Sequence, residues 1–90
     1  MDFEWDEAKN TANKLKHGIS FVQAVSIFEG RVRTVVDDRF DYGEVRKISF
    51  GALEDGTIVA VVHTERSGNR RLISVRLASA RERTFYERPL

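Results

Sequence analysis

The chain has 90 residues, which suits one domain, residues 1–90, around a single hydrophobic core. Its composition, 41% hydrophobic and 10% aromatic, argues against intrinsic disorder, and the lack of cysteine excludes disulfides, thiolate metal sites and a cysteine nucleophile. No apolar run approaches the roughly 20 residues that span a bilayer, and the acidic start, residues 1–6, is unlike a signal peptide. We therefore expect a cytoplasmic protein with no membrane partner.

The first predicted helix follows Phe3-Glu4-Trp5, a short strand or apolar anchor, and uses Asp6 as its N-cap. Four residues at helical spacing predict its buried stripe: Trp5, Ala8, Ala12 and Leu15. A different arc is polar and basic: Lys9, Asn13, Lys16 and His17. Gly18 is placed to end the helix in a left-handed conformation.

A second helix is predicted from Phe21 to Phe28, with Ser20 as its N-cap and Gly30 after its end. Its core face repeats at i, i+3, i+4 and i+7: Phe21, Ala24, Val25 and Phe28. Two helices this short should form a hairpin that covers a sheet.

From residue 31 onward the pattern is that of β-strands. Strands are predicted at residues 32–36, 46–53, 57–64 and 71–76, separated by polar turns that include Asp55-Gly56 and Ser67-Gly68-Asn69. Ser79 and Glu82 then form a capping box for a last helix that runs to about Glu87. The fold class is therefore α+β: an N-terminal helical hairpin packed on an antiparallel meander, with a C-terminal helix.

Standard enzyme motifs and a histidine-rich metal site are not found in the sequence. Asp37, Asp38 and Asp41 could in principle chelate Mg²⁺, but an acidic turn between strands is the favoured interpretation, and no cofactor is expected. What the chain offers is cations and groups that move protons. RNA supplies its own nucleophile, the 2′-hydroxyl, so a base, an acid and fixed cations are enough to cleave it.

The net charge of +1 conceals an asymmetry between the two halves of the chain. Residues 1–45 hold six Lys or Arg against nine Asp or Glu, whereas residues 46–90 hold nine Lys or Arg, eight of them arginine, against five. Arginine fits phosphate geometry, so the second half is the better candidate for contact with a polyanion. Solvated surface charges are the alternative, and a pI of 8.1 does not decide between the two.

Single residues leave further alternatives open. His17 either interacts with the carbonyls at a helix end or transfers protons, while His63, in the central apolar strand, is expected to be packed or edge-exposed. Arg71 and Arg76 lie five residues apart, which places them on opposite faces of a regular strand unless a bulge intervenes. Tyr86 belongs either to the core or to the site.

Read together, these segments resemble the BrnT toxins over nearly the whole chain. The most specific likeness is Phe3-Glu4-Trp5-Asp6, Lys9, Asn13 and Lys16-His17-Gly18-Ile19-Ser20-Phe21, followed by Ala24 and Phe28. Later segments are similar too: Arg46 with Ile48 and Gly51, residues 59–66, Arg71-Leu72-Ile73-Ser74-Val75-Arg76, and Arg81-Glu82 with Tyr86. One departure is Ile73-Ser74-Val75-Arg76, where the family usually has Ile-Ser-Ala-Arg.

The resemblance implies a RelE-like fold with helices on one side of the sheet, and a metal-independent ribonuclease that inhibits translation. It also implies a DNA-binding BrnA-like antitoxin whose complex with the toxin represses their operon, so that operator DNA is contacted only through the antitoxin. We expect RNA on the sheet face that is bordered by the first helix and the last two strands. The main candidates for catalysis are Lys16, His17, Arg46, Arg71 and Arg76, and the secondary RNA-binding candidates are Lys9, Arg66, Arg81, Glu82 and Tyr86. The rival hypothesis is a non-catalytic module that binds nucleic acid or protein.

Overall fold

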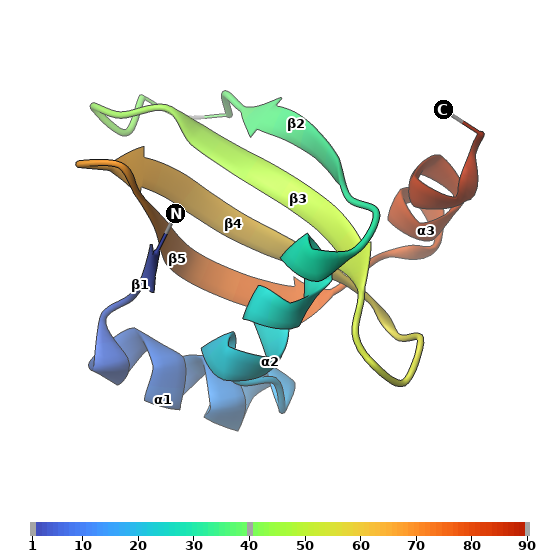
Figure 1. Cartoon of the computed structure of the whole chain (residues 1–90), viewed down its shortest axis with the longest axis horizontal. Coiled ribbons are helices and arrows are strands. Elements are labelled where there is room, and N and C mark those ends of the chain that lie inside the picture. The colour runs from blue at the N-terminus through green and yellow to red at the C-terminus, as the bar shows by residue number, and fades with distance from the viewer. Residues whose placement is uncertain (1, 40, 90) are drawn as a thin grey trace.

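A computed structural model describes residues 2–39 and 41–89 and contains one five-stranded sheet (Figure 1). In chain order the elements are β1 (Phe3–Glu4), α1 (Glu7–His17), α2 (Phe21–Val25), a 3₁₀ helix η1 (Ser26–Glu29), β2 (Arg33–Asp37), β3 (Arg46–Ala52), β4 (Ile58–Arg66), β5 (Asn69–Leu77) and α3 (Ala80–Glu87). The strand order is β1-β5-β4-β3-β2. Strands β2 to β5 form the predicted antiparallel meander, with ends displaced by at most two residues, whereas β1 pairs parallel to β5.

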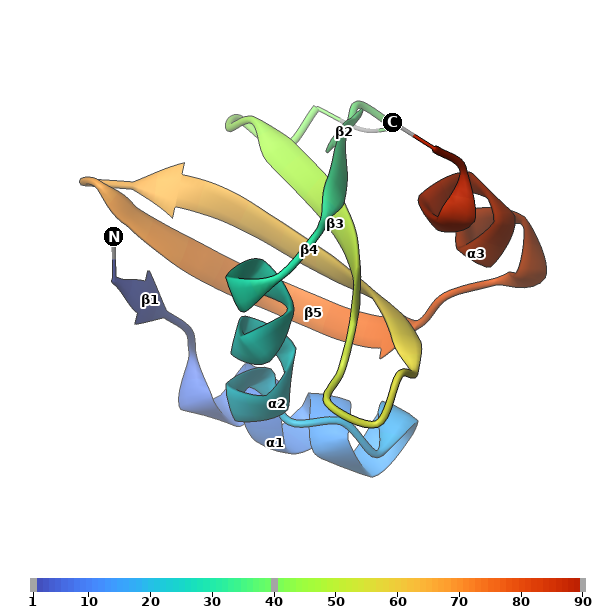
Figure 2. The same cartoon turned by 45° about the vertical axis from the view of Figure 1, so that its right-hand side comes forward.

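The two faces of the sheet carry separate hydrophobic clusters. Helix α2 lies against one face with α1 beside the edge of β5, and α3 lies on the other face (Figures 1 and 2). The first cluster joins α2 and η1 to β4 and β5, through residues that include Phe21, Ile27, Val59 and Leu72. The second joins the half-buried rings of α3 to β3 and β4: Phe85 and Tyr86 pack on Ile48, Phe50, Ala60 and Val62.

This arrangement confirms the α+β class but not the finer expectation. The prediction that all helices share one side of the sheet is wrong for α3, because its two aromatic rings bury the opposite face. The expected hairpin and RelE-like arrangement are not confirmed either, since α1 makes most of its tertiary contacts with β5. No helix among the described residues is both long and apolar enough to cross a membrane.

The predicted helix ends are confirmed by their hydrogen bonds. The Asp6 side chain accepts from the Ala8 N–H, Gly18 is left-handed with φ of 72°, and both Ser20 and Ser79 form capping boxes. The second helix differs from the prediction, because the α-helix stops at Val25 and continues as η1. At this point the Ser26 hydroxyl donates a hydrogen bond to the Gln23 carbonyl at 2.7 Å, and this bond competes with the backbone hydrogen bonds of a regular α-helix.

The predicted buried stripe of α1 is wrong. Ala8, Ala12 and Leu15 are exposed, and Leu15 is 85% exposed; Trp5 alone of the four packs against the core. The buried residues of α1 are instead Asn10 and Asn13. The helix is turned toward the protein by side-chain amides that bond to backbone groups, an interaction that hydrophobic periodicity does not detect.

Candidate active site

Asn13 attaches α1 to the free edge of β5. Its side-chain amide donates to the Val75 carbonyl at 2.8 Å and accepts from the Val75 N–H at 3.1 Å, as a neighbouring strand would. The same amide donates to the Ile19 carbonyl at 3.1 Å, and Asn10 accepts from the Phe21 N–H at 2.9 Å. The two bonds to Val75 satisfy strand-edge groups that would otherwise be unpaired, and they set α1 beside the last part of β5. The bonds to Ile19 and Phe21 fix the connection to α2.

The attachment forms a groove of about 430 Å³ between α1 and β5. We call it the α1–β5 groove. From α1 it is lined by Lys9, Ala12, Asn13, Lys16 and His17, and from β5 by Ile73, Ser74 and Arg76. Its volume lies within the range of about 300–1,000 Å³ that is usual for ligand clefts. Four of the ten predicted site residues, from two distant segments, therefore meet at one place: Lys9, Lys16, His17 and Arg76.

The groups in the groove are accessible and positively charged or able to exchange protons. Lys9 and Lys16 are exposed and His17 is half-buried, and within residues 2–39 and 41–89 none of the three side chains is hydrogen-bonded or ion-paired. The chemistry available is thus two ammonium groups and an imidazole, opposite a guanidinium. Such a set favours a phosphate over a neutral ligand.

Arg76 is the one groove cation with a charged partner. Its two terminal nitrogens donate to the two carboxylate oxygens of Glu82, at 2.7 and 2.9 Å. The hydrogen bond from Arg76 holds the pKa of Glu82 at about 2, and this carboxylate in turn raises the pKa of Arg76. Both groups are therefore charged at any pH where RNA is stable to acid.

A bulge in β5 places Arg71 and Arg76 on the same face of the sheet. Val62 is opposite Ser74 but His63 is opposite Leu72, which leaves Ile73 as an extra residue. The two arginines still lie apart. They pair with residues four apart on β4, Thr64 and Ala60, so their Cα atoms are separated by roughly 13 Å at about 3.3 Å per residue.

Arg71 also has its own partner at the far end of the strand. It donates to Glu4 of β1 at 2.7 Å, and this bond is the main cause of the lowered pKa of Glu4. The groove therefore does not include Arg71.

Arg46 lies outside the groove as well, on the same face. Across the sheet, Arg76 of β5 is level with Ala60 of β4 and Phe50 of β3. Arg46 lies four residues before Phe50 on β3. With about 4.8 Å between strands, the two arginines are roughly 16 Å apart. The Arg46 guanidinium lies 3.9 Å from the centroid of the Tyr42 ring and 3.8 Å from Glu44.

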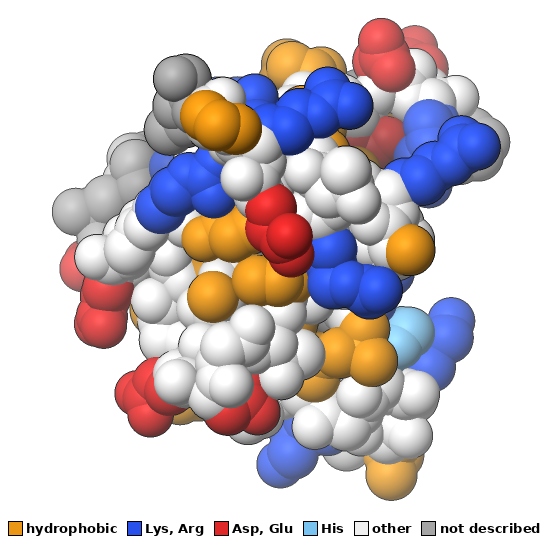
Figure 3. Space-filling model, turned by 90° about the vertical axis from the view of Figure 1, so that its right-hand side faces the viewer, with side chains coloured by type: hydrophobic (Ala, Val, Ile, Leu, Met, Phe, Trp, Pro, Cys, Tyr) orange, Lys and Arg blue, Asp and Glu red, His pale blue; other side chains and the backbone are white. Residues whose placement is uncertain are grey.

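The remaining secondary candidates are spread over other surfaces. Arg66, at the end of β4, pairs with Glu44 at 3.5 Å. On α3, Arg81 is exposed and lines a different hollow, while the Tyr86 hydroxyl donates to the Arg31 carbonyl at 3.0 Å. Figure 3 views the molecule from the side of α3 and shows Lys and Arg side chains around this face, with acidic side chains between them and a histidine beside a basic side chain. The face is thus a mosaic and not a uniformly basic surface.

The buried histidine His63 and the acidic residues Asp37 and Asp41 have hydrogen-bond partners within the protein. Of the two alternatives that the sequence left open for His63, packed or edge-exposed, the structure has the first: His63 is buried and hydrogen-bonds the Ser49 hydroxyl at 2.7 Å. Burial lowers the pKa of His63 to about 4. Asp37 accepts two hydrogen bonds from the Arg39 guanidinium, which lowers the pKa of this carboxyl. Asp41 accepts from the Gly43 N–H, so both carboxylates stabilise their own loop.

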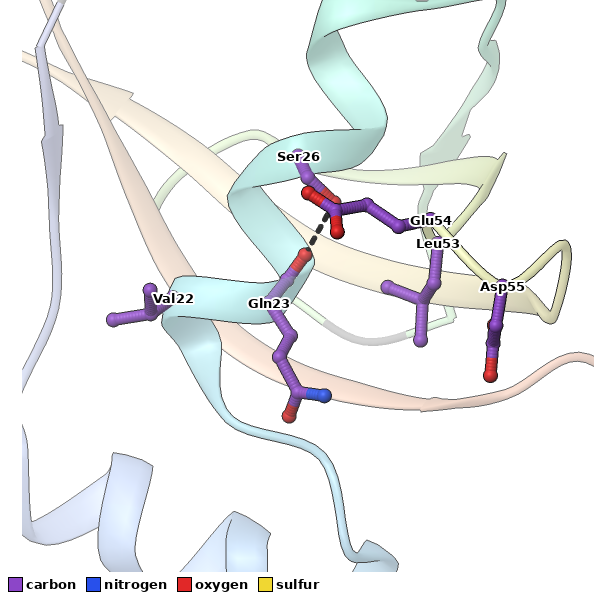
Figure 4. Close-up of a pocket in the computed structure, with 6 residues that line it drawn as sticks. All are labelled: Val22, Gln23, Ser26, Leu53, Glu54 and Asp55. Carbon is purple, nitrogen blue, oxygen red and sulfur yellow. Dashed lines mark hydrogen bonds between the residues drawn. The ribbon is translucent and has the colours of Figure 1, made fainter.

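A second cleft, of about 390 Å³, lies between α2 with η1 and the turn after β3 (Figure 4). Its walls are Val22, Gln23, Ser26, Leu53, Glu54 and Asp55. These side chains carry two carboxylates and no cation, which repels a polyanion. The α1–β5 groove is therefore the better candidate for RNA.

The sequence reasoning missed the structural role of Asn10 and Asn13, and the place of Ser74 in the groove wall. Asparagine is unfavourable inside a helix because its side chain competes for backbone hydrogen bonds. Two asparagines at i and i+3 were therefore a usable signal that this face of α1 bonds to another backbone.

Comparisons with known proteins identify related proteins. The family described as "Ribonuclease toxin, BrnT, of type II toxin-antitoxin system" matches residues 5–82. The crystal structure of the Brucella abortus ribonuclease toxin BrnT is similar, with a TM-score of 0.67 and 27% identity, covering 88% of this chain and 97% of that one. No curated protein sequence matches. The chain belongs to the BrnT family of ribonuclease toxins of type II toxin–antitoxin systems.

Proposed function

We propose that this protein cleaves RNA in the α1–β5 groove without a metal ion. The observation that carries the proposal is the meeting of His17 and two lysines, on α1, with Arg76, on β5. This set contains a group for proton transfer and several cations for one phosphate.

In the proposed reaction His17 removes the proton from the 2′-hydroxyl of RNA, since histidine accepts protons near neutral pH. The 2′-oxygen then attacks the adjacent phosphorus, and the bond from phosphorus to the 5′-oxygen breaks. The departing oxygen takes up a proton from water, His17 returns its proton to the resulting hydroxide, and the products are a 2′,3′-cyclic phosphate and a 5′-hydroxyl. Lys16 and Arg76 stabilise the charge that develops on the phosphate oxygens, and Lys9 holds the RNA backbone.

The outlying residues are proposed to contact RNA beyond the scissile phosphate. Arg46 and Arg71 are roughly 16 and 13 Å from Arg76, too far for the same phosphate. Arg66, Arg81 and Tyr86 are likewise proposed to contact nucleotides that flank the scissile phosphate. Such contacts would change the apparent affinity for RNA more than the rate of the chemical step.

The direct experiment is incubation of the purified protein with end-labelled RNA in excess EDTA. We expect cleavage, with products that end in a cyclic or a 3′-phosphate. Complete loss of cleavage in EDTA, with recovery on adding Mg²⁺, would contradict the metal-independent mechanism.

Variants test the groove itself. His17→Ala and Lys16→Ala should reduce cleavage strongly while the circular dichroism spectrum stays unchanged. Lys14→Ala is the matched control, because Lys14 lies in the same turn of α1 but does not line the groove. If His17→Ala cleaves RNA as fast as the wild type, the assignment of the groove is wrong.

The family also implies an antitoxin partner. The finer proposal is that cleavage inhibits translation in the cytoplasm until a BrnA-like, DNA-binding antitoxin neutralises it, and that the complex contacts operator DNA only through the antitoxin. Expression of the toxin should stop incorporation of labelled amino acids, and co-expression of the neighbouring gene product should restore it. Equal arrest by wild type and by a cleavage-deficient His17→Ala protein would favour non-catalytic binding.

A further inference from the structure

Glu82 lies at the meeting point of α3 and the α1–β5 groove. In the first turn of α3, its Oε1 accepts from the Ser79 N–H at 2.8 Å, and its own N–H donates to the Ser79 hydroxyl at 3.2 Å. The same carboxylate receives both terminal nitrogens of Arg76. One side chain thus caps a helix and holds a groove cation.

The bidentate pair leaves part of Arg76 available for a ligand. A guanidinium has five N–H donors. One hydrogen on each terminal nitrogen goes to Glu82, and a longer contact of 3.3 Å runs to the Leu77 carbonyl. Within the described part of the chain the Nε–H of Arg76 donates to no residue. Arg76 can therefore bind a phosphate while it remains fixed by Glu82.

We propose that Glu82 is a positioning residue: it acts on the reaction through Arg76, by holding the guanidinium in the groove, and it does not touch RNA itself. This inference rests on the proposed ribonuclease function and changes the role expected of Glu82, which the sequence suggested as an RNA-binding residue. A carboxylate repels phosphate, so direct contact with RNA would be unfavourable. Its two oxygens are also already occupied by Arg76 and the Ser79 N–H.

Contacts of α3 explain why the carboxylate is a firm anchor. The far end of the helix is held by two arginines: Arg33 of β2 donates to the Phe85 carbonyl at 2.9 Å, and Arg31, just before β2, donates to the Arg88 carbonyl at 2.7 Å. The Phe85 ring packs edge-on against Phe50, 5.8 Å between centroids. These contacts fix the C-terminal part of α3, and the Glu82–Arg76 pair joins its first turn to β5.

The test is Glu82→Gln, compared with Glu87→Gln as the matched control. Glutamine is accepted at this capping position, so α3 should stay folded, while the charged bidentate pair with Arg76 is lost. Glu87 is exposed on the same helix and makes no described ion pair. For Glu82→Gln we expect kcat to fall on the order of tenfold to a hundredfold, as for a misplacement of about 1 Å, while KM stays the same or falls, because a negative charge has been removed. Glu87→Gln should leave kcat unchanged.

Two further measurements separate positioning from other roles. In an Arg76→Lys background, Glu82→Gln should change kcat by less than about twofold, because the two residues act as one unit. The shape of the pH profile of kcat should not change. An equal loss in both backgrounds, or loss of one limb of the pH profile, would show that Glu82 acts independently or transfers protons, and would overturn the inference.

A readout besides activity is the NMR signal of the Arg76 guanidinium. Rotation of this group should be slow in the wild type and in Glu87→Gln, and fast in Glu82→Gln. Equal rotation in all three proteins would contradict the positioning role. If the wild type cleaves no RNA, the proposed function fails; if it cleaves and Glu82→Gln cleaves equally well, only the present inference fails.

Discussion

The side chain of Asn13 pairs with the backbone of Val75 through both of its polar atoms, so a helix residue takes the place of a neighbouring strand on the part of β5 that lies beyond β1. The pairing determines two things at once. It satisfies the exposed edge of the sheet, and it sets the separation between the basic residues of α1 and Arg76. Stability and site geometry are therefore linked at this contact.

Asn13→Ala should lower the free energy of unfolding by about 2–4 kcal/mol, because it leaves buried N–H and C=O groups unpaired. Urea denaturation measures this loss. Thr11→Ala, an exposed change on the same helix, is the control and should stay within about 0.5 kcal/mol. We also expect Asn13→Ala to lose RNA cleavage under conditions where it is still folded. A variant that is destabilised but fully active would show that the groove does not depend on this contact.

Much of the fold was predictable from local signals, and the wrong inward face of α1 has an identifiable physical cause. Helix caps such as Asp6 and Ser20 were predicted correctly because a cap depends on residues only a few positions away. The inward face of α1 was not, because Asn10 and Asn13 are buried by hydrogen bonds to distant backbone. Hydrophobic spacing registers only apolar burial, so it assigned Leu15 to the core although the residue is exposed.

Gly51→Ala should destabilise the protein by about 1–3 kcal/mol through overpacking. A Cβ at residue 51 would lie 2.8 Å from the Cβ of Ile27 and 3.2 Å from a methyl of Val32. Gly30→Ala is the matched control, since Gly30 has no neighbouring atom within 4 Å of such a Cβ and its φ is negative, at −120°. Thermal unfolding of the two variants compares them directly. Equal melting temperatures would mean that η1 moves away from β3 at little cost.

Stability should fall as the pH is lowered from 7 to 5, and His63 should be the main cause. Burial, together with the nearby charges of Arg70 and Lys47, lowers the pKa of His63 from 6.5 to about 4, while Glu65 opposes this. Below pH 6.5 the unfolded chain gains a proton here that the folded protein takes up only near pH 4. The contribution of neutral His63 to the free energy of unfolding is complete above pH 6.5. It is lost progressively below that pH, by up to about 3 kcal/mol.

Denaturant titrations at pH 7 and pH 5 measure this dependence. The His63→Gln variant, whose side chain can still bond to Ser49, should lose most of the fall in the free energy of unfolding between pH 7 and pH 5. The His17→Ala variant, changed at the surface of the groove, should keep that fall. The carboxyls with lowered pKa, such as Glu82, lose their contribution at more acidic pH and do not interfere in this window. An unchanged slope in His63→Gln would show that another group titrates.

The candidate site was predicted only in part, because contacts between distant segments decide which of the candidate residues meet. Lys16 and His17 are neighbours in sequence, so any helix end presents them together. Their meeting with Arg76 depends on the Asn13 contact, and the placement of Arg71 depends on the bulge at Ile73, which the spacing of residues left open. The sequence pattern did not identify Glu4 as the partner of Arg71, from which it is 67 residues away, or Glu82 as the partner of Arg76.

Arg71 and Arg76 provide the sharpest test of where the groove ends. Both lie on β5, on the same face, and each is paired with one glutamate. If the groove is the active site, Arg76→Gln should lower kcat by about 10²–10³, the usual loss for one donor to a transition-state oxyanion. Arg71→Gln should leave kcat within about threefold and raise KM modestly, through weaker contact with flanking RNA. Single-turnover cleavage of a short labelled RNA gives both values. Equal losses of kcat in the two variants would require RNA to bind along the full length of β5, with its reacting phosphate nearer the middle of the strand than His17 allows.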